Sequence, residues 1–321
     1  MVAQVPAQRP KRATQTVKKS RGVGAWKARP RAPRASRQKV IGILYGEGCD
    51  FHCVKNTCIL LSSSEFKLKL IDIKDVRKQR TLESLDVLLV GGGDDDDNRT
   101  DTREGRLDAD NHYGRGQRRA LGKQGMRAIV RKVKGGLMYV GICAGAYLAS
   151  AKTVEFGCDQ GAMNLRLCEV DIHREAVFAG GVTGAVELRT PKLVDEGLRR
   201  VLGRGCTMRF DDSAVMNVLD PESVTVLATY KRPVLRRTLA LTVPKNTSGK
   251  LAYSGTHRYL KHQHEMVGRP AVVLSQLQQG KVLLFGPHPE LHPVAPGLLP
   301  DRSSRSILKD LILNLLEEKR T

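Results

Sequence analysis

The segment from Leu137 to Ser150 constrains the fold of this chain more than any other. It begins as an apolar, β-prone run and changes at Cys143 into small, helix-compatible residues. Gly141 and Gly145 stand two positions before and after this cysteine, which gives the G-x-nucleophile-x-G pattern of a nucleophile elbow. Such a turn leads a strand directly into a helix, and its glycines avoid collisions that a Cβ atom would cause. The segment therefore predicts an α/β fold with a cysteine at the end of a strand.

The position of Cys143 suits a nucleophile. A thiol at this turn faces the first unpaired N–H groups of the following helix, whose partial positive charge favours the thiolate. The alternative is a buried, inert cysteine in a tight strand-to-helix turn, which is a common place for cysteine. This stretch alone gives the two interpretations equal weight.

A second motif lies far downstream, where the apolar run Lys281–Phe285 leads into Gly-Pro-His-Pro-Glu at Gly286–Glu290. The proline after His288 favours an extended backbone, in which residues two apart project to the same side. His288 and Glu290 can therefore point into one site, with the imidazole toward a thiol and the carboxylate fixing the tautomer of the ring. A proline-rich surface turn is the alternative for a lone histidine.

These two motifs together resemble the class I glutamine amidotransferase-like superfamily. More narrowly, the segments around Cys143 and His288 resemble the biotin-protein ligase N-terminal domain family, over roughly residues 40–293. The resemblance implies a flavodoxin-like three-layer α/β sandwich with a mostly parallel central sheet, a nucleophile elbow and hairpin insertions. It also implies a Cys-His-Glu triad of Cys143, His288 and Glu290. In true amidotransferases such a thiolate attacks the carboxamide of glutamine, forms a thioester and releases ammonia.

The resemblance extends to the surroundings of the thiol. The glycine-rich end of the strand before Asp94 corresponds to the family's oxyanion loop, which assigns the oxyanion hole to the backbone of Gly92 and Gly93 together with the N–H of Ala144. An ordinary glycine-rich turn is the alternative there. We place Tyr147 and Asp94 in the predicted substrate pocket. Typical glutaminases carry glutamine where Tyr147 stands, so glutamine is a doubtful substrate.

Composition predicts the domain organisation. Residues 1–39 contain twelve Lys or Arg and no Asp or Glu, within a chain whose net charge is +21. Such a segment buries too little apolar surface to fold alone, so we expect a disordered basic tail followed by one amidotransferase-like domain over 40–321. Charged or irregular stretches predict insertions into this domain at about 94–119 and 231–268. The C-terminal segment carries apolar residues at helical spacing, which predicts a helix covering one flank of the sheet.

The basic tail allows three interpretations: a transit peptide, an arm that binds RNA or another polyanion, and a solvated tail. We favour organelle import, in mitochondria, over a cytoplasmic or nuclear location. Seven cysteines without regular spacing indicate an intracellular, reducing compartment, and no apolar run is long enough for a membrane span. Cys49, Cys53 and Cys58 lack the paired spacing of zinc sites, so we predict no metal and no cofactor.

The sequence thus predicts a thiol-dependent hydrolase or transferase that acts on an amide-like carbonyl of a small molecule or peptide. A biotin-ligase catalytic domain and a synthetase domain that would receive ammonia are not recognisable in residues 1–321. The competing hypothesis is a catalytically silent amidotransferase fold that serves as an RNA- or ribonucleoprotein-associated assembly factor.

Overall fold

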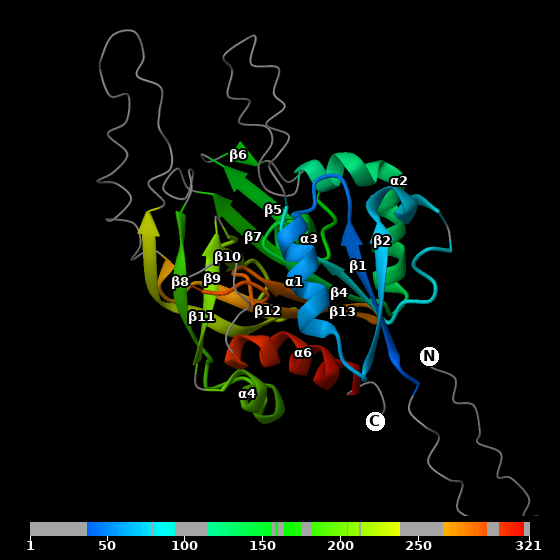
Figure 1. Cartoon of the computed structure of the whole chain (residues 1–321). Coiled ribbons are helices and arrows are strands. Elements are labelled where there is room, and N and C mark those ends of the chain that lie inside the picture. Colours follow the sequence, from blue (N-terminus) through cyan, green and yellow to red (C-terminus); the bar gives the residue numbers. More distant parts are fainter. Residues whose placement is uncertain are drawn as a thin grey trace, which may run out of the picture. The chain divides into compact units, whose positions relative to one another are not determined.

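The computed structural model describes residues 37–78, 80–93, 115–155, 158–159, 164–174, 182–203, 205–211, 213–237, 266–293 and 302–317. The chain divides into two units, Met1–Arg37 and Gln38–Thr321, and the helices and strands belong to the second (Figure 1). Almost all of the predicted basic tail, and Asp94 of the predicted pocket, lie outside the described residues.

Within the described residues, nine strands form one large sheet. Their order is β2 (Phe66–Asp72), β1 (Lys39–Tyr45), β3 (Val87–Val90), β4 (Met138–Ile142), β13 (Gly280–Phe285), β12 (Pro270–Leu277), β11 (Val224–Arg237), β8 (Val182–Arg189) and β9 (Gly205–Asp211). The first five are mutually parallel. Counted along the chain they follow the order 2-1-3-4-5, which is that of flavodoxin-like folds. The other four extend the sheet by antiparallel pairing.

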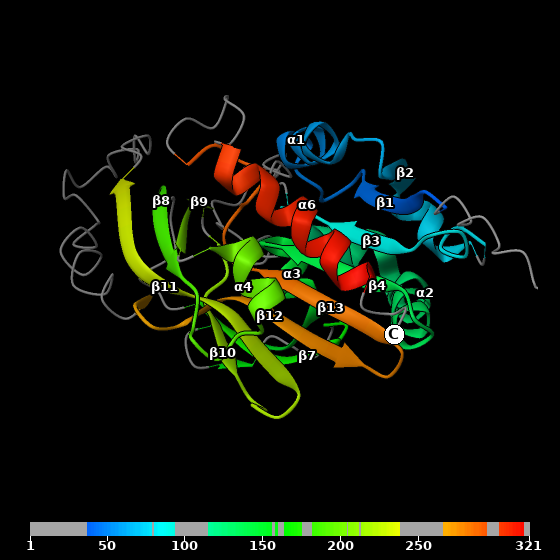
Figure 2. The same ribbon diagram turned by 90° about the horizontal axis from the view of Figure 1, so that it is seen from below.

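The parallel strands are buried on both faces because their side chains alternate between two hydrophobic clusters. In β3, Val87 and Leu89 join one cluster, whereas Leu88 and Val90 join the other. Helices α1 (Phe51–Leu61), α4 (Glu196–Leu202) and α6 (Arg302–Glu317) cover the first face, as Figure 2 shows for α1 and α6. The opposite face is covered by the 3-10 helix η1 (Ile73–Arg77), α2 (Arg115–Lys134) and α3 (Ala144–Ala149).

A second sheet packs beside α3 on that opposite face. Among the described residues it has four strands, in the order β10 (Met216–Val218), β7 (Cys168–Arg174), β5 (Ser150–Glu155) and β6 (Cys158–Asp159). β5 begins immediately after α3, so the elbow helix is only six residues long. In this sheet β5 and β6 form an antiparallel hairpin, whereas β5 pairs with β7 in parallel and β7 pairs with the more distant β10.

The fold prediction is confirmed: the domain is a layered α/β structure with a large sheet and a parallel half that carries the elbow. The predicted C-terminal helix is α6, and its apolar residues, Ile307, Leu308, Leu311, Ile312, Leu315 and Leu316, are buried in the first cluster. α2 begins at Arg115 and β11 continues to Arg237, so each element includes part of a segment that the sequence assigned to an insertion. None of the described helices combines the length and apolar character that crossing a bilayer requires.

Candidate active site at the carboxyl ends of the strands

Cys143 occupies a strained turn between β4 and α3. Its backbone has φ 51° and ψ −107°, a conformation that residues other than glycine rarely adopt. The two flanking glycines have room for no side chain. A Cβ on Gly141 would lie 2.6 Å from the carbonyl oxygen of Gly145, and a Cβ on Gly145 would lie 2.0 Å from the carbonyl oxygen of Val90. The predicted elbow is therefore present, and tight packing against β3 explains its glycines.

Strand pairing brings the histidine motif to the elbow. Phe285, the last residue of β13, pairs with Ile142 of β4, and its carbonyl accepts a hydrogen bond of 2.9 Å from the N–H of Cys143. His288 follows three residues later. Its N–H donates to the carbonyl of Arg209 in β9 at 2.7 Å, which fixes the segment on its other side. Two strands distant in sequence thus position the imidazole beside the thiol.

The three predicted triad residues lie together. Cys143 lies close enough to His288 to raise the pKa of its imidazole, and Nδ1 of His288 lies 2.8 Å from Oε1 of Glu290. The exposed fractions are 9% for Cys143, 3% for His288 and 0% for Glu290. The sulfur is also 3.9 Å from the carbonyl oxygen of Asp211. A thiol, an imidazole and a carboxylate therefore lie together in the interior, and the thiol is the least buried of the three.

Two opposing effects set the protonation of His288. Burial lowers its pKa, because the charged imidazolium loses its water. The charge of Glu290 raises the pKa, and Cys143 and Cys53 add to this effect. The outcome is a pKa well above the ordinary value of histidine. The imidazolium that forms when His288 accepts a proton is therefore stabilised by the neighbouring carboxylate.

The loop after β3 is held through its carbonyl groups. The carbonyl of Gly91 accepts from the N–H of Gly145 at 3.2 Å, and that of Gly92 accepts from the N–H of Asp50 at 2.9 Å. Nε2 of Gln117 in α2 also donates to both carbonyls, at 3.2 and 3.4 Å. With the carbonyls occupied in this way, the backbone conformation of the predicted oxyanion loop is fixed.

Two of the residues predicted to donate to an oxyanion adjoin the imidazole or the thiol. A Cβ on Gly92 would lie 3.1 Å from Cε1 of His288, and Ala144 directly follows Cys143 at the start of α3. Within the part of the chain that the structure describes, the N–H groups of Gly92, Gly93 and Ala144 donate to no protein acceptor. Tyr147, which the sequence placed in the substrate pocket, has 3% exposure and packs in the second hydrophobic cluster.

Sequence reasoning missed two close neighbours of the site. Gln117 fell inside a predicted insertion, and nothing in its local pattern marks it as a buried side chain. Cys53 lies buried in α1, and its Sγ is 3.7 Å from Nδ1 of His288. Only the packing of α1 against the strand ends brings this second thiol to the site.

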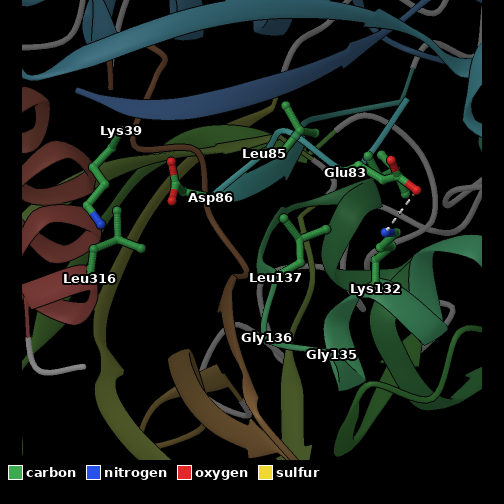
Figure 3. A pocket seen from close by; sticks show the side chains of 10 residues that line it. Lys39, Glu83, Leu85, Asp86, Lys132, Gly135, Gly136, Leu137 and Leu316 are labelled. Carbon is green, nitrogen blue, oxygen red and sulfur yellow. Dashed lines mark ion pairs between the residues drawn. The ribbon is translucent and has the colours of Figure 1, made fainter. Parts of the chain in front are cut away.

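A cavity of about 300 Å³ lies at the opposite ends of the strands (Figure 3). Lys39 begins β1, while Asp86 and Leu137 immediately precede β3 and β4, so this cavity opens at the amino ends of the parallel strands. Glu83 and Lys132 form an ion pair of 3.8 Å at its edge. The cavity is therefore distinct from the site of Cys143.

Comparison with solved structures identifies the class of fold. A chain of PurLQS from Thermotoga maritima superposes with a TM-score of 0.51 and 15% identity, covering 87% of this chain and 99% of the other. A putative GMP synthase subunit from Thermoplasma acidophilum superposes with a TM-score of 0.47 and 12% identity, covering 88% of this chain and 96% of the other. A putative ThuA-like protein from Bacteroides uniformis superposes with a TM-score of 0.48 and 11% identity, covering 89% of this chain and 94% of the other. The superposition on the PurLQS chain shows that the domain has the class I glutamine amidotransferase-like fold.

The family comparison is narrower. Residues 41–186 match the family model "Biotin-protein ligase, N terminal". The matched residues include the glycine loop and Cys143 but end before His288. No match to a curated protein sequence is found.

Burial suppresses the thiolate form of three thiols in the domain. It raises the pKa of Cys49 and of Cys168 to about 12, and that of Cys53 well above the usual value. At pH 8 a thiol of pKa 12 is about one part in ten thousand thiolate. We expect iodoacetamide at pH 8 to alkylate Cys143 before Cys49, Cys53 or Cys168 in the folded protein, as read by peptide mass spectrometry. In concentrated urea all four should react alike; equal labelling of the folded protein would contradict the expectation.

Proposed function

We propose that this domain is a thiol-dependent hydrolase or transferase acting on an amide-like carbonyl. The observation that carries the proposal is the grouping of Cys143 beside His288, whose Nδ1 is 2.8 Å from Oε1 of Glu290, with the sulfur on a strained elbow at the carboxyl ends of the parallel strands. Ligand sites in open α/β sheets lie at these strand ends. An inert core cysteine has no need of a buried imidazole and carboxylate in series beside it.

The first half-reaction begins with proton transfer. Glu290 accepts the Nδ1 proton of His288 in a hydrogen bond, which leaves Nε2 to take the proton of the Cys143 thiol. The thiolate attacks the carbonyl carbon, a C–S bond forms, and the carbonyl electrons move to the oxygen. The N–H groups of Gly92, Gly93 and Ala144 stabilise this oxyanion. When the C–N bond breaks, Nε2 returns the proton to the leaving amine and a thioester remains.

The second half-reaction releases the acyl group. Water, or the nucleophile of an acceptor, gives a proton to Nε2 of His288 and attacks the thioester carbon. The C–S bond then breaks and Cys143 recovers the proton as a thiol. Hydrolysis and acyl transfer differ only in this second nucleophile. The stabilisation of imidazolium by Glu290 supports both steps, because His288 is protonated between them.

The test uses an electrophilic amide or chloroketone probe on the full chain. We expect stoichiometric labelling of Cys143, and a rate that falls by about 100-fold or more in His288→Ala, because general-base assistance typically contributes 10² to 10⁴. Cys206→Ser serves as the matched control, since this thiol is only partly buried and belongs to β9. Labelling of Cys143 at an unchanged rate in His288→Ala would refute the proposal.

A screen of glutamine and small amides, with Cys143→Ala as the inactive control, would define the substrate. Tyr147 stands where glutaminases carry glutamine, so we expect amides other than free glutamine to react. The alternative hypothesis of RNA binding rests on residues 1–39, almost all of which lie outside the described part of the chain.

A further inference from the structure

A second thiol shares the imidazole of the proposed triad. Cys53 in α1 places Sγ 3.7 Å from Nδ1 of His288, and this nitrogen lies 2.8 Å from Oε1 of Glu290. One ligand atom from each of the three residues lies within 4.8 Å of the others. Their exposed fractions are 3%, 3% and 0%. Sulfur, imidazole nitrogen and carboxylate oxygen are thus gathered in the interior, on the side of the ring that faces Glu290.

One buried oxygen atom of this cluster is available to a ligand. Within the described residues, Oε2 of Glu290 is buried and has no hydrogen-bond partner. A buried carboxylate oxygen without a partner destabilises the folded state, because it has lost its hydration and has formed no hydrogen bond in exchange. A cation bound among these three side chains would satisfy the sulfur and the carboxylate together.

We infer that Cys53, His288 and Glu290 form a binding site for a thiophilic divalent cation such as Zn²⁺. These are three of the ligand types that zinc takes in proteins. Around one tetrahedral ion, sulfur and nitrogen stand about 3.6 Å apart, and the Cys53–His288 separation is 3.7 Å. Nitrogen and carboxylate oxygen would stand about 3.3 Å apart, so the 2.8 Å hydrogen bond must open by roughly half an ångström.

The number of ligands leaves one coordination position open. Structural zinc sites are closed by four protein ligands, whereas three leave the fourth position to water or another small ligand. The cluster is therefore suited to an ion that keeps a small molecule as its fourth ligand.

Metal binding would block the thiol chemistry. The ion displaces one proton from Cys53 to solvent and occupies Nδ1 of His288, so the proton of the neutral ring moves to Nε2. Nε2 can then no longer accept the proton of Cys143. The ion binds whether or not Cys143 is catalytic, whereas the inhibition rests on the proposed function. Zn²⁺ is thus expected to inhibit the reaction without coordinating the sulfur of Cys143.

Cd²⁺ provides the direct test, because its bond to thiolate gives an ultraviolet charge-transfer band. The full chain, reduced and metal-free, should bind one equivalent with this band, and calorimetry should give one equivalent of Zn²⁺. Loss of an outer partner of a metal ligand costs 10- to 100-fold in affinity. Loss of a ligand itself should cost more, so Cys53→Ser and Glu290→Gln should each weaken binding by at least about 100-fold. Circular dichroism would verify that both variants fold.

Two further variants separate this inference from the proposed function. Cys143→Ala should keep the band and the affinity, because its sulfur is not a ligand, and Cys206→Ser should behave as the unmutated chain. In the probe-labelling assay, Zn²⁺ should slow the reaction of Cys143 in the unmutated chain and leave the Cys53→Ser variant unaffected. A band that survives in Cys53→Ser or disappears in Cys143→Ala overturns the inference. A normal band with no reactivity at Cys143 would instead count against the proposed function alone.

Discussion

Replacing Glu290 with glutamine is expected to lower the free energy of unfolding by about 3 kcal/mol at pH 6, because removing one partner of a buried ion pair leaves the other uncompensated. Glu290 has no exposed surface and its Oε1 lies 2.8 Å from Nδ1 of His288. Glutamine keeps the size of the side chain and removes only the charge. Urea unfolding followed by circular dichroism measures the loss, with Glu222→Gln at the surface as the matched control.

The pH dependence of this loss identifies its cause. Glu290 raises the pKa of His288 in the folded protein, above the value of about 6.5 expected in the unfolded chain. The folded state therefore binds the imidazole proton more tightly than the unfolded state does. The resulting stability is complete below about pH 6.5 and is lost as pH rises through the folded pKa. The free energy of unfolding of the unmutated chain should thus exceed that of Glu290→Gln most at pH 6, and the difference should shrink progressively in alkaline solution. A gap that stays constant with pH would mean that packing, and not charge, holds Glu290.

The parts of the site that the sequence predicts are those that depend on local geometry. Gly141 marks the elbow because a Cβ there would collide with the carbonyl oxygen of Gly145, four positions later in the same turn. His288 and Glu290 project together because they stand two apart in an extended segment. These relations extend over a few residues, and a single sequence contains all the information that determines them.

The parts that could not be predicted arise from long-range packing. Gln117 reaches the glycine loop only because α2 crosses the strand ends, and Cys53 reaches His288 only because of the way α1 packs. Arg209 positions His288 through its carbonyl, which any residue type at that position would provide. The continuation of the sheet by four antiparallel strands is also non-local, since an apolar run of this length fits either pairing. Side-chain chemistry at these positions contains no signal of the partner.

Substituting Gly145 with alanine is expected to destabilise the domain strongly, by about 3 kcal/mol, through overpacking. The new Cβ would stand 2.0 Å from the carbonyl oxygen of Val90 and 2.8 Å from its carbonyl carbon. Both are backbone atoms, and Val90 is held in the ladder between β3 and β4. The N–H of Gly145 also donates to Gly91, so a shift that relieved the clash would break the contact between the elbow and the glycine loop.

Gly91→Ala is the matched control for Gly145→Ala, because it adds the same methyl group on the other side of this contact. Its Cβ would meet only the Cβ of Cys53, at an ordinary 3.7 Å. Since its backbone needs no left-handed conformation, we expect its stability to change by no more than about 1 kcal/mol. Urea unfolding of the two variants decides the matter. If both unfold at the same urea concentration, close packing of β3 against α3 is not what requires glycine at position 145.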